Sequence, residues 1–460
     1  MAIMRSVNPT TGVELATFEQ DSEDAVEQKL AAANAAVPQL KAAGWARRAE
    51  LMNAAADLLE ADLEQVAAMI TDEMGKPIAQ SRGEVAKSVY AMRYYAENAE
   101  GFLSGRSLDD PSAVGASRAG TRFDPLGVVL AVMPWNYPIW QVIRFAAPAL
   151  MAGNAGLLKH ASNVPQAAVY LGHLFTRAGF PEGSFSTLLI GAGRVEGVIR
   201  DPRVSAVTLT GSEPAGRSVA SIAGDVLKKV VLELGGSDPF IVMPSADLDA
   251  AAEMAVKART SNNGQACINA KRFIVHTDAY AAFSEKFAEK MAALQIGDPQ
   301  DEGTDIGPLA TSSGRKDIVE LVEDAREKGA DIVVGGSFDD SADGWFYPPT
   351  VIAGITPEMR LYAEEAFGPV ASLYEVASLD DALAIANGLD FGLGSAFWSS
   401  DEAEIGHAIK TIESGAVFVN GMTISYPELP FGGIKRSGYG RELSAEGIRE
   451  FCNLKTVWVA

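Results

Sequence analysis

Cysteine, histidine and long apolar segments are scarce in this sequence of 460 residues. The two cysteines, Cys267 and Cys452, cannot form a disulfide framework, and the four histidines lack the spacing of metal ligands. Apolar stretches such as residues 126–133 are too short to span a bilayer, and the first residues, MAIMRSVNPTTGVEL, lack the apolar core of a signal peptide. We therefore expect a cytoplasmic protein with no bound metal and no membrane partner.

Positive charge is also scarce, because 38 Lys and Arg residues stand against 60 Asp and Glu residues and leave a formal net charge of −22. Nucleic acids and anionic membranes bind to clustered Lys and Arg, so this composition argues against nucleic acid as a partner too. An anionic small molecule would need a locally basic site. The length exceeds what one hydrophobic core usually supports, and two or more domains are expected.

The spacing of apolar residues divides the chain into a helical start and two α/β series. Residues 21–103 repeat Ala, Leu and Met at steps of three and four, which indicates helices. From residue 126 onward, β-branched runs alternate with helical stretches, which predicts mostly parallel sheets buried on both faces. The polar segment 103–123 is a linker, an extended arm or an edge hairpin. The predicted strands are GVVLAVM, AGLLK, FSTLLI, VSAVTLT and VVLEL, then RFIVH, DIVVG, AFWSS and GAVFVN, with helices near 248–261 and 279–294 in the second series.

Two glycine-rich segments match nucleotide-binding loops only in part. GSEPAGRS, residues 211–218, follows a predicted strand, but Arg217 replaces the lysine of a phosphate-binding loop, which argues against a nucleoside triphosphatase. GAGRVEG, residues 191–197, has one residue too many before its last glycine, and a strand-to-helix turn explains it equally well. The first segment still predicts a glycine turn at a helix N-terminus, where free N–H groups can face a phosphate or the flat end of a cofactor.

Three side chains are candidates for acyl chemistry. Cys267 lies in NNGQACIN, among small and polar neighbours that leave room for a substrate; for this segment alone, nucleophile and loop thiol are equally good interpretations. Glu233 ends a predicted buried strand, either as a functional carboxylate or as half of a strand-end salt bridge. Asn136 follows another strand, and its amide either donates to an oxyanion or caps a helix.

Six segments, in order along nearly the whole chain, resemble the NAD(P)-dependent aldehyde dehydrogenase superfamily. The resemblance implies an α/β fold with a Rossmann-like cofactor domain (residues 1–105 and 124–234), an α/β catalytic domain (235–443) and a small β oligomerisation element, an arm of residues 106–123 and 444–460. Such arms complete a neighbour's sheet, so a homodimer or homotetramer is expected. The segments are MPWNYPIW with Asn136, KHAS at 159–162, VLELGGSDPF with Glu233, GQACINAKRF with Cys267, EEAFGPV with Glu365 and Phe367, and PFGGIKRSGYGRE at 430–442.

The resemblance also assigns catalytic roles. Cys267 would attack the aldehyde as a thiolate, and the Asn136 amide and the Cys267 backbone N–H would hold the resulting oxyanion. Glu233 would help to activate the thiol and then the water that releases the acid. A cysteine hydrolase or acyltransferase without a nicotinamide is the alternative of a different class, but it normally needs a histidine base, and no histidine lies in a catalytic-looking motif.

Family positions around the dinucleotide predict the cofactor site. Members that prefer NAD usually carry a glutamate three residues after the position of Lys159, where this chain has Ser162. Serine removes the repulsion of a 2′-phosphate, and Lys159 adds positive charge, so NADP is the expected cofactor and NAD a secondary one. The cofactor-binding residues implied by the resemblance are Trp135, Asn136, Lys159, Ser162, Gly211, Ser212, Glu213, Pro214, Leu234, Glu365 and Phe367.

The predicted substrate depends on Arg144, eight residues after Asn136. Its simplest interpretation is a salt bridge at the surface or between domains. In members that oxidise succinic semialdehyde, however, an arginine at this spacing binds the distal carboxylate, and a serine of a late loop, here Ser425, assists. Two positions depart from such relatives, because Ser261 replaces a second arginine and Asn269 a second cysteine. We expect an aldehyde with a distal carboxylate, succinic semialdehyde first, and keep another semialdehyde or a neutral aliphatic aldehyde as the alternative.

Overall fold

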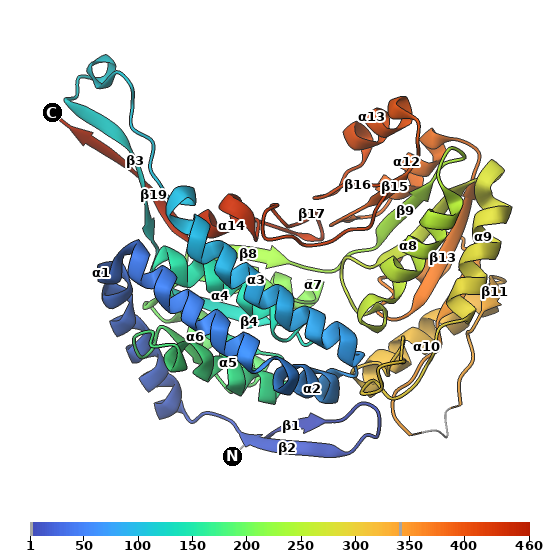
Figure 1. The fold of residues 1–460 in the computed structure, drawn as a ribbon, viewed down its shortest axis with the longest axis horizontal. Helices are drawn as coiled ribbons and strands as arrows, with labels where there is room; N and C mark the ends of the chain where they lie inside the picture. Colours follow the sequence, from blue (N-terminus) through green and yellow to red (C-terminus); the bar gives the residue numbers. More distant parts are fainter. Residues whose placement is uncertain (1–2, 340–342) are drawn as a thin grey trace.

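Two α/β lobes and a projecting two-stranded ribbon form the chain in the computed structural model, which describes residues 3–339 and 343–460 (Figure 1). A hairpin of β1 (Ile3–Val7) and β2 (Glu14–Glu19) runs along the first lobe, and its tip reaches the second. There the N–H of Trp345 donates to the carbonyl of Pro9 at 3.0 Å. The N-terminal hairpin therefore helps to join the lobes.

The first lobe is built on a six-stranded sheet in the order β18–β8–β7–β4–β5–β6. Neighbouring strands are parallel except for β18, which runs antiparallel to β8. The five parallel strands confirm the strands predicted from the first series of β-branched runs. They are β4 (Val128–Met133), β5 (Ala155–His160), β6 (Phe185–Thr187), β7 (Val204–Thr210) and β8 (Lys229–Glu233), and the late strand β18 is Gly438–Tyr439.

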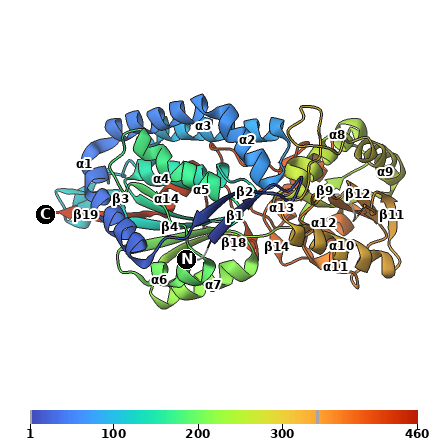
Figure 2. The same ribbon diagram turned by 90° about the horizontal axis from the view of Figure 1, so that it is seen from below.

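Helices cover both faces of this sheet, with α1 to α5 on one face and α6 and α7 on the other (Figure 2). The helices predicted over 21–103 are confirmed as α1 (Glu23–Ala61), α2 (Leu63–Met74) and α3 (Ile78–Phe102). Within the described ranges, no helix combines the length and the apolar character needed to cross a membrane. The remaining helices of this lobe are α4 (Trp140–Ala152), α5 (Pro165–Arg177), α6 (Val195–Arg200) and α7 (Glu213–Asp225).

The second lobe has a seven-stranded sheet in the order β11–β12–β13–β10–β9–β15–β16, parallel except where β11 meets β12. It confirms the strands and the two helices predicted from the second series. Its strands are β9 (Asp238–Val242), β10 (Ala270–His276), β11 (Asp331–Val334), β12 (Thr350–Ala353), β13 (Val370–Val376), β15 (Ala396–Trp398) and β16 (Phe418–Val419). Its helices are α8 (Leu248–Thr260), α9 (Thr277–Ala292), α10 (Ser312–Glu327), α11 (Arg360–Ala363), α12 (Leu379–Asn387) and α13 (Glu402–Thr411), and β14 (Phe391–Gly392) and β17 (Ile434–Lys435) form a short separate ladder.

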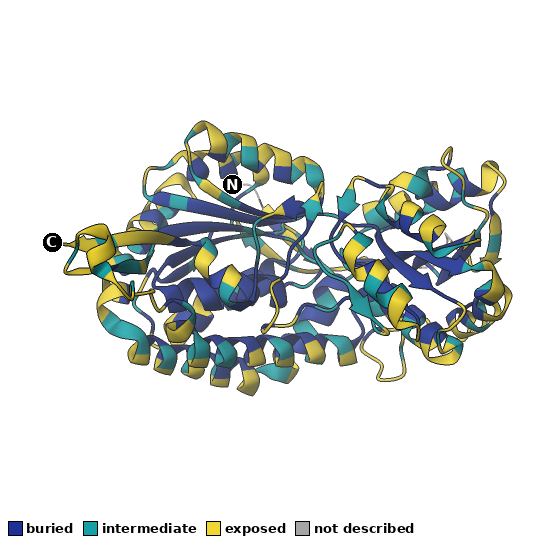
Figure 3. Ribbon diagram, turned by 90° about the horizontal axis from the view of Figure 1, so that it is seen from above, coloured by how far each residue is buried: buried dark blue, intermediate teal, exposed yellow. Residues whose placement is uncertain are grey.

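The polar segment after α3 leads into an extended arm. β3 (Arg118–Pro125) pairs antiparallel with β19 (Cys452–Val459), and the ribbon projects from the first lobe with exposed residues along it (Figure 3). A bridge between Ser107 and Gly120 folds the preceding chain back onto β3. The late helix α14 (Ser444–Glu450) packs on α3 and α4 instead. The domain boundaries given above stay predictions.

Candidate active site

The carboxyl ends of the parallel strands in the first sheet bring together residues that lie far apart in the sequence. The chain builds this sheet from β4 through β5 to β6 and then returns to the other side of β4 with β7 and β8, so the strand order reverses between β4 and β7. In parallel α/β sheets, ligands bind in the crevice at such a reversal. The residues at or just after these strand ends are Trp135, Asn136, Lys159, Ser162, Gly211, Ser212 and Leu234.

This edge of the sheet suits a phosphate-bearing dinucleotide. Ser212 is the N-cap of α7, but its side chain makes no capping hydrogen bond, and Pro214 lies in the first turn. A hydroxyl and N–H groups are therefore available at a helix N-terminus. Lys159 is partly buried at the end of β5, where burial lowers its pKa, and Ser162 is exposed nearby in the sequence.

The two carboxylates predicted to bind the cofactor have different surroundings. Glu213 pairs with Arg436 at 2.5 Å and with a second arginine, and these partners lower its pKa. Glu365, from the second lobe, pairs with Lys271 at 2.9 Å. It lies so close to Gly235 that a Cβ there would come within 2.4 Å of Glu365 Oε2. Glu365 thus reaches the end of β8, whereas Glu213 is held by protein partners.

Apolar contacts link the same strand ends to the rest of the protein. The rings of Trp135 and Phe367 meet edge to face, with centroids 5.7 Å apart and an interplanar angle of 88°. Leu234 packs so closely on Gly216 of α7 that a Cβ on this glycine would come within 2.6 Å of the leucine. Trp135 therefore connects the end of β4 to the second lobe, and Leu234 connects β8 to α7.

A loop in left-handed backbone conformation carries the candidate nucleophile. Asn262, Asn263 and Gly264 have φ angles of 58°, 55° and 75°. Asn and Gly tolerate this conformation better than other residues do. The Asn263 amide donates to two backbone carbonyls at 2.7 and 2.9 Å, and the Asn262 amide donates to the carbonyl of Asn136 at 2.8 Å. The left-handed backbone before Cys267 therefore favours Asn and Gly at these three positions, apart from any role in catalysis.

Cys267 is half-buried at the wall of a pocket and is a free thiol. Burial raises its pKa to about 12, opposed first by the positive charge of Lys271 and then by that of Arg144. Lys271 Nζ donates to the carbonyl of Cys267 at 2.6 Å and to that of Ala266 at 3.0 Å. In this state the thiol holds its proton at neutral pH, so nucleophilic attack requires an activating charge or base.

Asn136 is not a helix cap. Its Nδ2 donates to the carbonyl of Gln265 at 2.9 Å, which fixes the amide beside the Cys267 loop and leaves its second N–H. The start of α4 is capped by Glu84 instead, whose Oε1 accepts from the N–H groups of Ile139 and Trp140 at 2.8 and 2.9 Å. Of the two interpretations of Asn136, the oxyanion donor is the one that agrees with these contacts.

Glu233 is a buried carboxylate without a partner. Its side chain is 1% exposed, and neither oxygen has a hydrogen-bond partner among the described residues. Burial raises its pKa well above the usual range, and the charge of Glu442 raises it further, while Arg144 and Arg441 oppose this. No ion pair of Glu233 is found within residues 3–339 and 343–460, so the strand-end salt bridge is not observed. Its Oε1 lies near Gly432.

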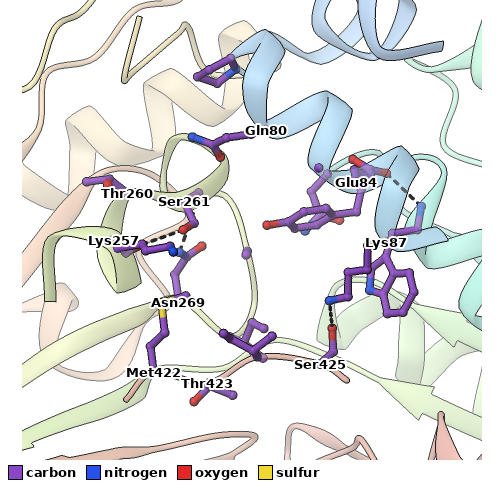
Figure 4. A pocket seen from close by; sticks show the side chains of 18 of the residues that line it. Gln80, Glu84, Lys87, Lys257, Thr260, Ser261, Asn269, Met422, Thr423 and Ser425 are labelled. Atoms are coloured by element: carbon purple, nitrogen blue, oxygen red, sulfur yellow. Dashed lines mark hydrogen bonds between the residues drawn. The ribbon is translucent and has the colours of Figure 1, made fainter. Parts of the chain in front are cut away.

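A pocket of about 680 Å³ lies between α3, α4, α8 and three loops, and Figure 4 shows part of its lining. Four predicted residues line it, namely Cys267, Asn136, Arg144 and Ser425, and so do Ser261 and Asn269, while Glu233 does not. No histidine is among the lining residues of the described chain, which disfavours a cysteine hydrolase. Across the described ranges, no group of three or more His, Cys, Asp and Glu side chains is placed to hold a metal ion.

Arg144 lines the pocket and also belongs to a buried ion pair. Its Nε pairs with Glu442, and the two side chains are 2% and 4% exposed. Nη2 donates to Thr210 Oγ1 at 3.4 Å, and the guanidinium lies 4.8 Å from the ring centroid of Phe431. The two interpretations of Arg144, internal ion pair and pocket residue, are therefore compatible.

Sequence reasoning missed the charged residues of α3. Glu84 pairs with the fully buried Lys76, and Lys87, three residues after Glu84, lines the pocket and donates to Ser425 Oγ at 2.8 Å. It also missed Lys271 and Glu442. The spacing of Glu84 and Lys87 places them on one helix face, but nothing in the sequence indicates that this face borders Cys267.

Comparison with known proteins gives a consistent result. The sequence profile of the aldehyde dehydrogenase family matches residues 2–457. The chain is 59% identical over 455 residues to a succinate-semialdehyde dehydrogenase [NADP(+)] 1 of Mycobacterium tuberculosis, and 60% identical over 455 residues to that of Mycobacterium ulcerans, each time covering 99% of both chains. Among solved structures, succinic semialdehyde dehydrogenase from Streptococcus pyogenes in complex with NADP+ superposes with a TM-score of 0.95 at 36% identity, covering 99% of both chains.

Proposed function

Because the chain belongs to the aldehyde dehydrogenase family, we propose that it oxidises succinic semialdehyde to succinate with NADP, and with NAD secondarily. The observation that carries this proposal is the pocket, in which a free thiol, an amide donor and cationic side chains line one cavity. The full-length similarity to enzymes named for this substrate and cofactor supports it.

Cys267 is the proposed nucleophile. Its Sγ would form a bond to the aldehyde carbon, and the carbonyl oxygen would become an oxyanion that accepts hydrogen bonds from Asn136 Nδ2 and from the Cys267 backbone N–H. Loss of one such donor costs about 3 kcal/mol of transition-state stabilisation. A nicotinamide, when bound, supplies the acceptor for the hydride that leaves this carbon. Cys267 then carries the acyl group as a thioester.

Glu233 is the proposed base for hydrolysis of the thioester. It would take a proton from the attacking water, and the thiol of Cys267 and the free acid would be released. Burial and the nearby charge of Glu442 raise its pKa, so that Glu233, once ionised, is a stronger base than an exposed glutamate. A positive charge or water that approaches Glu233 favours its ionised form, which is the form that can accept the proton.

One feature supports the preference for NADP over NAD, and a second supports binding of either dinucleotide. Ser162 is exposed at the edge that carries Lys159, and no acidic side chain replaces it to repel a 2′-phosphate. The free first turn of α7 suits the pyrophosphate common to both dinucleotides.

The proposed substrate orientation places the distal carboxylate near Arg144 and Ser425. These residues lie at the wall formed by α3, α4 and the late loop, and they share the pocket with Cys267. A neutral aliphatic aldehyde would not need charged groups here.

The proposed assembly is a homodimer or homotetramer. The ribbon of β3 and β19 exposes large apolar side chains, among them Leu454 at 57% and Trp458 at 51%, which suits an interface with another copy. The proposed location is the cytoplasm, because both cysteines are free thiols.

Absorbance of reduced nicotinamide tests the function directly. The purified protein should reduce NADP faster than NAD with succinic semialdehyde, and kcat/KM for this substrate should exceed that for butanal, a neutral aldehyde of the same carbon count. Equal values for the two aldehydes would favour the neutral-aldehyde alternative. Hydrolysis of an ester or thioester, together with no reduction of NADP or NAD by either aldehyde, would favour a hydrolase.

A further inference from the structure

A lysine of α3 stands at the wall of the aldehyde pocket without an acidic partner. Lys87 is partly buried, its Nζ donates to Ser425 Oγ at 2.8 Å, and it lies 4.3 Å from the ring centroid of Trp140 (Figure 4). No ion pair within residues 3–339 and 343–460 includes it. Its contacts are a neutral hydroxyl and an aromatic face, neither of which cancels its charge.

The charged groups around Lys87 are already paired with one another. Glu84 on the same helix is shared between Lys76 and the start of α4. Arg144 on α4 pairs with Glu442. Each of these pairs is close to neutral as a whole, so Lys87 is the source of net positive charge at this wall.

The other lysine of the pocket differs in its setting. Lys257 on α8 lies on the opposite side of the cavity from Lys87 and is exposed (Figure 4). Water screens an exposed ammonium group, whereas a partly buried one beside an aromatic ring interacts more strongly with an anion. Lys257 therefore offers a matched control for the charge of Lys87.

We propose that Lys87, together with the Ser425 hydroxyl, binds the distal carboxylate of the aldehyde and determines the preference for an acidic substrate. The inference rests on the proposed function. A carboxylate at this position would accept from Lys87 Nζ, and the Ser425 hydroxyl, which accepts from Lys87, would donate to the substrate. Arg144 can add a hydrogen bond to the substrate carboxylate. Its positive charge is already neutralised by Glu442, so Lys87 supplies the net positive charge.

The ionisation of Lys87 adds a second observable. Burial lowers its pKa to about 7, Arg144 and Lys76 lower it as well, and Glu84 opposes them. As the pH rises through this value, the free enzyme loses the positive charge and with it the attraction for a carboxylate. A neutral aldehyde does not respond to this charge, so the ratio of kcat/KM for succinic semialdehyde to that for butanal isolates the effect from titration of Cys267.

The test compares this ratio in the wild type and in Lys87→Met, Lys87→Arg and Lys257→Met. Lys87→Met should lower the ratio about ten- to hundredfold, mainly through KM for succinic semialdehyde, as expected for losing a charge-assisted contact. Lys87→Arg should keep most of the wild-type ratio. It should also remove the decline of this ratio above pH 7, because an arginine stays charged. Lys257→Met should change it less than about threefold.

Each outcome decides between the proposals. Retained butanal turnover in Lys87→Met shows a folded enzyme. The role of Lys87 is overturned if Lys87→Met keeps the wild-type ratio of kcat/KM, or if its kcat/KM falls equally for both aldehydes. It is also overturned if Lys257→Met lowers the ratio as much as Lys87→Met does. In each of these cases the proposed function stands. A wild-type ratio near one overturns the proposed function itself.

Discussion

Replacement of Arg144 by alanine should affect stability and substrate preference through two different contacts. Arg144 and Glu442 are almost completely buried and paired with each other. Removal of one partner of a buried pair typically costs about 3–5 kcal/mol of unfolding free energy, because the other charge stays buried. We therefore expect a clearly lower midpoint of urea unfolding for Arg144→Ala. Activity falls for both succinic semialdehyde and butanal.

A double variant separates the two contacts. Arg144→Met combined with Glu442→Gln removes the unpaired charge and should regain most of the unfolding free energy, since neutral replacements of a buried pair are often tolerated. If the guanidinium also donates to the substrate carboxylate, the double variant should still prefer succinic semialdehyde over butanal less than the wild type does. The ratio of their kcat/KM values should fall roughly ten- to hundredfold, which corresponds to about 1.5–3 kcal/mol. The assay is reduced-nicotinamide absorbance with both aldehydes on the same preparation. Wild-type discrimination in a stable double variant would show that Arg144 only neutralises Glu442.

Three further substitutions test the proposed chemistry. Cys267→Ala should abolish reduction of NADP yet leave NADP binding intact by calorimetry; turnover above a trace would remove its assignment as nucleophile. Glu233→Gln should slow release of the acid about 10²- to 10⁴-fold and leave an acyl-enzyme that mass spectrometry detects, whereas wild-type turnover would contradict its role as base. Ser162→Glu should shift the ratio of kcat/KM from NADP toward NAD, because a carboxylate repels a 2′-phosphate; an unchanged ratio would place that phosphate elsewhere.

The regular elements could be predicted because each has a local cause in the sequence. The β-branched runs became the buried parallel strands, since strands covered on both faces by helices need continuous apolar residues. The two residues of β18 could not be predicted, because a strand so short has no period of its own and exists only where β8 offers an edge. The pairing of β3 with β19 joins segments more than 300 residues apart and likewise has no local signal.

The site was predictable where chemistry restricts the residue type. Cys267 stands out because thiols are rare in the chain, and Asn136 and Glu233 belong to segments with a recognisable resemblance. Lys271 is different, because an ordinary lysine in a strand becomes part of the site only when the fold brings Glu365 to within 2.9 Å of it. The environment of Glu233 also depends on Glu442, which approaches only in the folded chain.

The strongly negative protein can attract an anionic substrate because the charges of Glu84 and Arg144 beside Lys87 are neutralised in pairs. A net charge of −22 would repel a carboxylate at long range in dilute salt, but screening confines that repulsion to about 10 Å at 0.1 M ionic strength. At shorter range the pairs Lys76–Glu84 and Arg144–Glu442 contribute little net field, and one unpaired ammonium can decide the sign of the potential. Higher salt should therefore raise the on-rate for the substrate slightly or leave it unchanged, whereas the loss of Lys87 should weaken binding at any ionic strength. The specificity of such a site depends on which charge is left without a partner.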